Sequence, residues 1–316
     1  MNRSFSILIC TALLGFAGCR DKADSPVIDG ELALRYAQEN YDLGPKVYRT
    51  EGAKRSAEWI EKQAAEMPGL LESGGQVGIV GNGAIKNVEI ILPPTVRNSA
   101  QGTAGGDFIV VGAHHDTKML FSVPEFAGAN DGASGVGALL AMAHACVERM
   151  QTQPLPCSIR FVFFDGEEAL YQYTDTDGLV GSRAYVEMLR QNGELKHCRA
   201  MVLLDMIGDK DLHVELAGNS TRALAKTVLA AADGLGHADK FSAGTVNMID
   251  DHYPFLQAGI PAVDIIDFSF GPDNHYWHTG ADTMDKISAE SIKTAADVAL
   301  RTIWLLAESG FKDLPK

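Results

Sequence analysis

The amino-acid sequence predicts an α/β fold with three layers, α/β/α, in which helices cover both faces of a central mixed, mostly parallel sheet. The first observation behind this prediction is that segments of strand length alternate along the chain with segments of helix length, as expected for strands joined by helical crossovers. The second is that strand segments such as "FIVVGA" and "AMVLL" are apolar throughout, so both of their faces must be covered. With 316 residues, 46% of them hydrophobic, the chain is able to bury such a core.

The expected elements follow one another in a regular order. Apolar residues at helical spacing, with charges between them, indicate helices over residues 52–67, 136–150, 181–191, 221–236 and 289–310. Alternation and β-branched residues indicate strands over residues 87–92, 107–116, 158–168, 200–209 and 261–268. A glycine-rich turn, "GANDGASG", precedes the second of the helices, and Ser288 is placed to cap the last one.

The first residues have the layout of an export signal. An apolar run over residues 5–18 follows a single arginine and is too short to span a bilayer comfortably. Small residues stand before Cys19, as in a bacterial lipobox. We therefore expect a lipoprotein-type signal peptide at 1–18, a tether at 19–30 and one catalytic domain at 31–316. The protein is expected to be exported and anchored through Cys19 in the cell envelope, facing the periplasm or in the outer membrane. An ordinary secretory peptide is the alternative.

Composition limits the partners of this protein. The formal net charge is −14, and lysine and arginine do not cluster into a stripe that could follow phosphates, so we expect no nucleic-acid partner. Membrane contact is expected only through the N-terminal lipid, and the sequence does not predict an oligomeric state. Beyond the anchor, Cys146, Cys157 and Cys198 have no Cys-x-x-Cys spacing. We expect them to be small buried residues, although an oxidising envelope leaves one disulfide open.

Acidic and histidine side chains recur where the predicted strands end or in the loops after them, at His114, Asp131, Glu167, Glu168, Asp205, Asp251 and His278. In open α/β sheets, ligands collect outside the carboxyl ends of the strands, so we expect these side chains to converge on one crevice. Carboxylates that converge without lysine or arginine carry a desolvation and repulsion penalty unless a cation lies among them. A mixed set of carboxylate and imidazole ligands suits zinc.

Six short motifs carry a family resemblance: "GAHHDT", "GANDGASG", "FFDGEE", "LLDMIGD", "DDHYPF" followed by "GIP", and "YWHT" followed by "DT". In this order and spacing they resemble the M28 zinc peptidase family and its offshoot, the glutaminyl-peptide cyclotransferases. The resemblance covers residues 32–308 and implies a zinc aminopeptidase-like fold. Neither His-Glu-x-x-His nor Gly-x-Ser-x-Gly is present, which argues against helical zinc proteases and serine hydrolases.

The resemblance implies a ligand set for zinc. Asp131, Glu168 and His278 match the ligands of the zinc ion that the whole family retains. His114 and Asp205 match the further ligands of a second zinc in the two-metal aminopeptidases, where Asp131 would bridge the two ions. A cyclotransferase would hold one zinc and an aminopeptidase two.

The resemblance also implies the catalytic residues. Glu167 matches the general base, and Asp116 matches the acid that holds a metal-ligating histidine. In the cyclotransferase branch, Asp205 and Asp251 belong to an acidic network near Glu167. Trp277 resembles the indole that lines the pocket for an N-terminal glutamine, and Phe255 is expected to wall the same pocket.

Two reactions on peptide or protein N-termini compete for this site. Cyclisation of an N-terminal glutamine to pyroglutamate, with release of ammonia, is favoured by Trp277 and by the doubled acid Asp250-Asp251, where the aminopeptidases usually have Ser-Asp. Hydrolysis of the first residue by an aminopeptidase is the alternative, and it would use water rather than the substrate's own α-amine as the nucleophile. A binding protein that has lost catalysis is a third class, but the chain keeps Glu167 and every ligand position.

Overall fold

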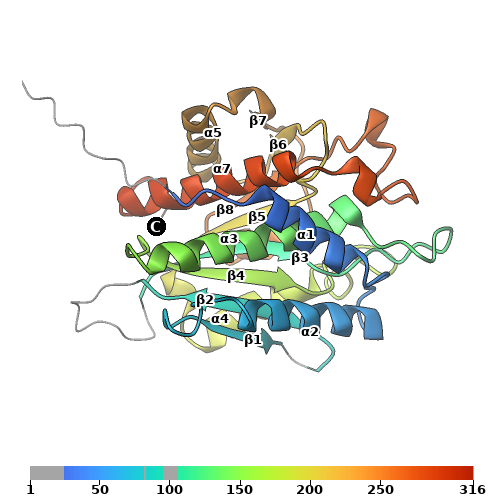
Figure 1. Ribbon diagram of the computed structural model, residues 1–316, viewed down its shortest axis with the longest axis horizontal. Coiled ribbons are helices and arrows are strands. Elements are labelled where there is room, and N and C mark those ends of the chain that lie inside the picture. Colours follow the sequence, from blue (N-terminus) through green and yellow to red (C-terminus); the bar gives the residue numbers. More distant parts are fainter. Residues whose placement is uncertain (1–24, 82, 95–105, 316) are drawn as a thin grey trace, which may run out of the picture.

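The main sheet has six strands in the order β1-β2-β4-β3-β5-β8 (Figure 1). The protein is represented by a computed structural model that describes residues 25–81, 83–94 and 106–315. The strands are β1 Gln76–Val80, β2 Asn87–Leu92, β3 Phe108–His114, β4 Ser158–Phe164, β5 Cys198–Asp205 and β8 Ala262–Ile266. The neighbours β4, β3, β5 and β8 run parallel, whereas β2 is antiparallel to both β1 and β4. The predicted mixed, mostly parallel sheet is therefore confirmed.

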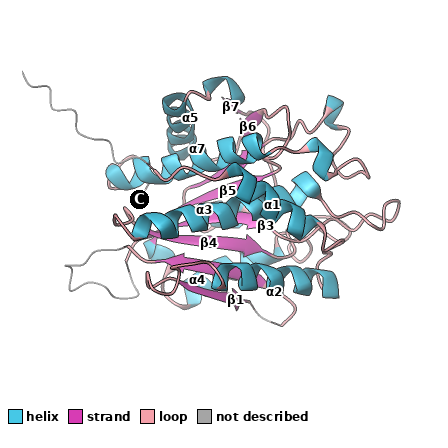
Figure 2. Ribbon diagram, in the orientation of Figure 1, coloured by secondary structure: helices cyan, strands magenta, loops and turns pink. Residues whose placement is uncertain are grey.

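Helices cover both faces of this sheet, as Figure 2 shows. They are α1 Gly30–Tyr41, α2 Glu51–Ala65, α3 Gly135–Met150, α4 Val180–Gln191, α5 Arg222–Leu235, α6 His252–Gln257 and α7 Ala289–Glu308. Residues of α1, α2, α3, α5 and α7 share the larger hydrophobic core. Residues of α4 and α6 belong to a second core with the other face of the sheet. The three-layer architecture follows from this division.

Smaller elements complete the described chain. A second sheet pairs β6 Val214–Leu216 with β7 Phe241–Ala243 in parallel. Single helical turns are η1 Ala129–Ser134, η2 Leu195–His197, η3 Ala238–Lys240, η4 Pro272–Asn274 and η5 Met284–Lys286. Of these, η1 leads directly into α3 and carries one of the candidate metal ligands.

All ten predicted helices and strands are present, with ends shifted by a few residues. The sequence patterns did not indicate α1, β1, α6 or the small sheet. The helix α1 begins at Gly30, where Asp29 accepts hydrogen bonds from the backbone N–H groups of Glu31 and Leu32. It packs mainly on α3, η1 and α7, so its position depends on tertiary contacts rather than on its own composition.

Residues 1–24, with the predicted signal peptide, Cys19 and the first half of the predicted tether, lie outside the described residues. The end of the predicted tether is attached to the domain, because Ile28 is buried and its N–H donates to the Asp297 carboxylate. Within the described residues, no helix is both long and apolar enough to span a membrane. Cys146, Cys157 and Cys198 are buried free thiols, as predicted, and the disulfide left open by the sequence is not formed.

Candidate metal centre

The candidate ligands come from elements that are far apart in the sequence and meet at one edge of the sheet. His114 is the last residue of β3, and Asp205 is the last residue of β5. Glu168 follows shortly after β4, and His278 lies in the loop between β8 and α7. Because β3, β4 and β5 are parallel, their carboxyl ends bring these side chains to the same edge.

Asp131 reaches the site from η1, a turn whose backbone requires glycine. Gly128 and Gly132 have positive φ angles of 58° and 101°, which side-chain-bearing residues rarely adopt. A Cβ atom on Gly128 would lie 2.0 Å from the carbonyl oxygen of Asp131. The Asp282 carboxylate accepts hydrogen bonds from the N–H groups of Asn130 (2.7 Å) and Asp131 (3.2 Å). The turn is therefore held from both sides while the Asp131 carboxylate points to the two histidines.

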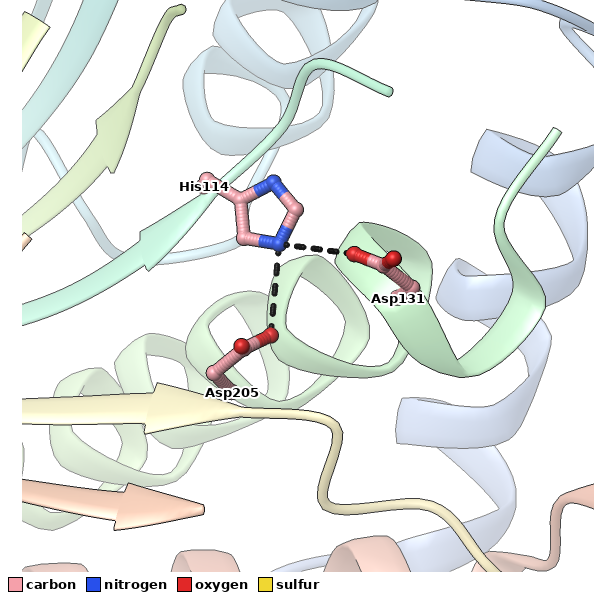
Figure 3. Close-up of side chains that lie close together, drawn as sticks. All are labelled: His114, Asp131 and Asp205. Atoms are coloured by element: carbon pink, nitrogen blue, oxygen red, sulfur yellow. Dashed lines mark hydrogen bonds and ion pairs between the residues drawn. The ribbon is translucent and has the colours of Figure 1, made fainter. Parts of the chain in front are cut away.

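Asp131 lies between two imidazoles, as Figure 3 shows for His114. His114 Nε2 is 3.3 Å from Asp131 Oδ1 and 3.2 Å from Asp205 Oδ1. On the other side, His278 Nε2 is 3.1 Å from Asp131 Oδ2 and 2.8 Å from Glu168 Oε1. One carboxylate thus faces both predicted ligand sets, one with each oxygen.

These two sets have the arrangement that metal binding requires. In each, three ligand atoms lie within 4.8 Å of one another, and the sets are His114 with Asp131 and Asp205, and Asp131 with Glu168 and His278. Asp131 Oδ2 is buried, and apart from its ion pair with His278 it has no polar partner among the described residues. Nitrogen and oxygen ligands of this kind fit zinc. The residues predicted to hold one or two zinc ions are therefore brought together, with Asp131 in the shared position.

Asp116 contacts both glutamates and one of the candidate histidine ligands. Its carboxylate accepts hydrogen bonds from the N–H groups of Glu167 (3.0 Å) and Glu168 (3.2 Å). Its backbone oxygen lies 3.2 Å from His114 Nδ1. Because the other ring nitrogen then faces the ligand set, these contacts orient the imidazole and both glutamates.

The electrostatics of the metal-free site are dominated by its acids. Burial opposes protonation of both histidines, but the neighbouring carboxylates overcome it. Asp131 and Glu168 raise the pKa of His278 to about 10, and Asp116, Asp131 and Asp205 raise the pKa of His114 well above its ordinary value. Without a metal, protons on the two imidazoles therefore provide the positive charge that the carboxylates need.

Glu167, the predicted base, belongs to neither ligand set. It is buried, and burial followed by the charges of Glu168 and Asp250 raises its pKa well above its ordinary value. Tyr173 donates a hydrogen bond from its hydroxyl to Glu167 Oε1 at 2.9 Å. A raised pKa brings the protonated and ionised forms of this carboxyl closer in free energy, as a proton carrier requires.

Behind Glu167 lies a buried acidic group that includes the predicted residue Asp251. Burial is the main cause that raises the pKa of Asp251 to about 7 and the pKa values of Asp250 and Asp264 well above their ordinary range. His252 Nδ1 lies 3.7 Å from Asp264, and both side chains are fully buried. Asp205, which also belongs to a metal-ligand set, contributes to the charge felt by Asp250 and Asp264.

Of the two predicted pocket residues, one lies at the site and the other does not. Trp277 is partly exposed and stacks on the His278 imidazole, with ring centroids 4.1 Å apart. Phe255 has no exposed surface and packs in the second core against Phe164 and Tyr185. The prediction that Phe255 walls the pocket is therefore wrong, because α6 directs this side chain under the sheet rather than toward the crevice.

Sequence patterns missed two residues beside the glutamates. Lys118 Nζ lies 3.0 Å from Glu168 Oε2 and 5.3 Å from the centre of the Tyr173 ring. Tyr173 reaches Glu167 because the Asp177 carboxylate accepts hydrogen bonds from three successive N–H groups, those of residues 170–172. Lysine next to "HHDT" was visible in the sequence, but only the fold shows that it faces Glu168.

The sequence profile of peptidase family M28 matches residues 96–303, about two-thirds of the chain. The chain belongs to this family. Among curated M28-type relatives, aminopeptidase YwaD of Bacillus subtilis is 31% identical over 205 residues, covering 63% of this chain and 41% of YwaD. The glutaminyl-peptide cyclotransferase of Drosophila melanogaster is 30% identical over 204 residues, covering 57% of this chain and 56% of that protein. The chain thus spans about half the length of these curated relatives.

The fold is also found in solved structures. The crystal structure of a glutaminyl cyclase from an Acidobacteriales bacterium aligns with a TM-score of 0.78 and 30% sequence identity. The alignment covers 91% of this chain and 98% of that chain. The family and the α/β/α fold are therefore confirmed.

Proposed function

We propose that this protein is a zinc-dependent glutaminyl-peptide cyclotransferase, which converts the N-terminal glutamine of peptides to pyroglutamate and releases ammonia. The observation that carries the proposal is the doubled acid Asp250-Asp251, buried behind the base Glu167. The likeness to the Acidobacteriales glutaminyl cyclase, over nearly the whole of that chain, supports it. The cyclotransferase of Drosophila melanogaster supports it further.

The residues at the site suit this reaction. Zinc held by Asp131, Glu168 and His278 would supply Lewis-acid polarisation of the side-chain amide carbonyl of glutamine. Trp277, stacked on His278, would wall the pocket that holds the glutamine side chain. Positioning matters most here, because the nucleophile and the carbonyl belong to the same residue.

Proton transfer is the task of Glu167. The α-amine nitrogen forms a bond to the amide carbon, and the bond from that carbon to the amide nitrogen breaks. The proton lost by the α-amine passes through Glu167 to the departing nitrogen, which leaves as ammonia, so no water is consumed. Asp251 and Asp205 would keep the charge around Glu167 such that it accepts and returns this proton.

An aminopeptidase is the second candidate, and one observation favours it. His114, Asp131 and Asp205 form a complete second ligand set, which would hold a second zinc ion and leave Glu167 to take a proton from water. The similarity to YwaD is in agreement with this alternative. The number of zinc ions therefore distinguishes the two reactions.

For the cellular setting, we propose export through the N-terminal segment and lipid anchoring at Cys19. The signal-like pattern of residues 1–18 supports this. Peptide and protein N-termini outside the cytoplasm would then be the substrates.

The experiment that tests the function is mass spectrometry of two peptides, one beginning with glutamine and one with leucine, after incubation with a zinc-loaded fragment that begins at residue 22. The proposal predicts that the glutamine peptide loses ammonia while the leucine peptide stays intact. Loss of the leucine residue would instead establish the aminopeptidase. Spontaneous cyclisation is measured with the Glu167→Gln variant as the matched control.

A further inference from the structure

A lysine is fully buried next to the turn that carries Asp131. Lys46 lies between α1 and α2 and has no exposed surface. Its Nζ donates hydrogen bonds to the backbone oxygens of Ala127 (2.8 Å) and Gly44 (3.3 Å). Among the described residues it forms no ion pair with a carboxylate. A buried ammonium held only by carbonyl oxygens is costly, so its surroundings must compensate for the charge.

The compensation comes from the acids of the metal centre. Burial lowers the pKa of Lys46 to about 8, and the negative charges of Asp282, Asp116 and Asp131 act in the opposite direction. Asp131 is the candidate bridging ligand. Asp282 and Asp116 accept hydrogen bonds from backbone N–H groups next to the ligands. Lys46 is therefore close enough to the centre to interact with it, yet it contacts none of the ligand atoms.

The contacts of Lys46 join the two segments that carry the ligands. Its backbone N–H donates to Thr117 Oγ1 (2.9 Å), and its backbone oxygen accepts from the N–H of Thr117 (3.3 Å). Thr117 directly follows Asp116. On the other side, the Ala127 carbonyl that Nζ holds belongs to the residue just before Gly128, where the turn to Asp131 begins. One residue thus connects the strand end behind His114 with the turn that supplies Asp131.

We propose that Lys46 is a positioning residue of the metal centre, whose ammonium fixes the Ala127 carbonyl and thereby the turn from which Asp131 faces both ligand sets. Asp282 holds the same turn by its N–H groups, so the turn is fixed at a carbonyl before it and at amides within it. The inference concerns the ligand geometry and holds for either reaction, and it can therefore fail without affecting the proposed function.

The test uses the fragment that begins at residue 22, loaded with Co²⁺, which reports ligand geometry through its visible absorption spectrum. Lys46→Met removes the ammonium but keeps an unbranched side chain. We expect an altered spectrum and Co²⁺ binding weakened by about 10- to 100-fold in competition with a chelator, the range typical of residues that support metal ligands. Lys46→Arg, which keeps charge and donors, should recover part of the affinity.

Lys54→Met is the control, because Lys54 is a half-exposed lysine on α2 that pairs only with surface glutamates in the described chain. If Lys46→Met does not fold, Lys46→Gln carries the test, because its shorter, neutral side chain removes the ammonium that reaches the Ala127 carbonyl, and the same altered spectrum and weakened Co²⁺ binding are expected. A lowered melting temperature with an unchanged spectrum and unchanged Co²⁺ affinity would show a purely structural role and overturn the proposal. Tighter Co²⁺ binding would also overturn it, because removal of a repelling charge would then outweigh any loss of positioning.

Discussion

At the scale of single residues, the site depends most on Asp131, because its two oxygens face different histidines. Oδ1 lies near His114 and Oδ2 near His278, so the same carboxylate would serve either one zinc ion or two. Glu167 and Glu168 are adjacent in the sequence, but only Glu168 belongs to a ligand set. The neighbouring negative charges are tolerated because Glu168 is paired with His278 and Lys118, whereas Glu167 accepts a hydrogen bond from Tyr173 and has a raised pKa.

Zinc binding should release a proton from His278. In the metal-free protein its pKa is raised to about 10, so the imidazole is protonated near neutral pH and must lose this proton to bind zinc. Zinc affinity should therefore rise with pH until the pH passes about 10. Titration calorimetry in two buffers of different ionisation enthalpy should give about one proton released from His278 per zinc bound at the Asp131, Glu168 and His278 set.

The His278→Ala variant is the comparison. It should lose the proton contributed by His278 and hold less zinc after dialysis, as measured by metal analysis. Full zinc occupancy in this variant would remove His278 from the ligand set.

Glu167→Gln should separate catalysis from metal binding. The amide cannot carry a proton, so we expect turnover to fall by about 10²- to 10⁴-fold, with zinc content unchanged because Glu167 lies in neither ligand set. Initial rates and metal analysis measure the two effects. Glu187→Gln, on the exposed side of α4, is the control and should keep full activity. Normal turnover of Glu167→Gln would mean that another group transfers the proton.

At the scale of elements, the distinctive feature is the turn η1 at the start of α3. Gly128 and Gly132 allow the chain to bend so that Asp131 points into the crevice rather than continuing the helix. The rest of α3 is almost entirely buried under α1 and α7. A rigid helix thus anchors one end of the turn, while the contacts of Asp282 and Lys46 fix the other parts.

Gly128→Ala should damage the metal centre as well as the fold. The left-handed backbone alone costs about 1–2 kcal/mol for a residue with a Cβ atom, and the clash with the Asp131 carbonyl adds to this cost. Gly193→Ala is the matched control, because Gly193 has a φ of 71° but open space around it. Urea unfolding should show a larger loss for Gly128→Ala, and only this variant should bind zinc more weakly. Equal losses and equal zinc affinities would contradict the role of the turn.

At the scale of the whole molecule, the parallel strands and their covering helices bring the acids together at one edge. The cores on the two faces of the sheet hold the strand ends in register, and the ligands follow from that register. Many buried carboxylates at one edge repel one another in the absence of a cation. In the metal-free protein the protonated His114 and His278 offset part of this repulsion, and zinc would take over that role.

Zinc should accordingly stabilise the protein against unfolding. Binding to the native state alone adds about 2.7 kcal/mol when free zinc is at ~100 times its dissociation constant. Melting curves with zinc, with a chelator and with magnesium measure this effect. Magnesium should have little influence, because it prefers oxygen ligands in an octahedral site. Equal melting temperatures in zinc and in chelator would argue against a zinc site.

Much of the fold was predictable because its main elements carry strong local patterns. The buried strands β3, β4 and β5 are apolar along their length, and α3 and α7 are long and periodic. The elements that were missed are weak locally. The strands β6 and β7 have three residues each, α6 has six and contains Pro254, and the polar helix α1 owes its place to α3 and α7.

By itself, the sequence determined the fold class, the family and the residue types that make a zinc site, because six motifs place acids and histidines at strand ends, where parallel topology requires them to meet. Only the tertiary structure decided which of these groups touch. In it, Asp131 lies between two histidines and Phe255 packs in the second core. Lys46 donates a hydrogen bond to the carbonyl just before the turn. Such contacts join residues tens to hundreds of positions apart, so they depend on how helices and strands pack and leave no local pattern in the chain.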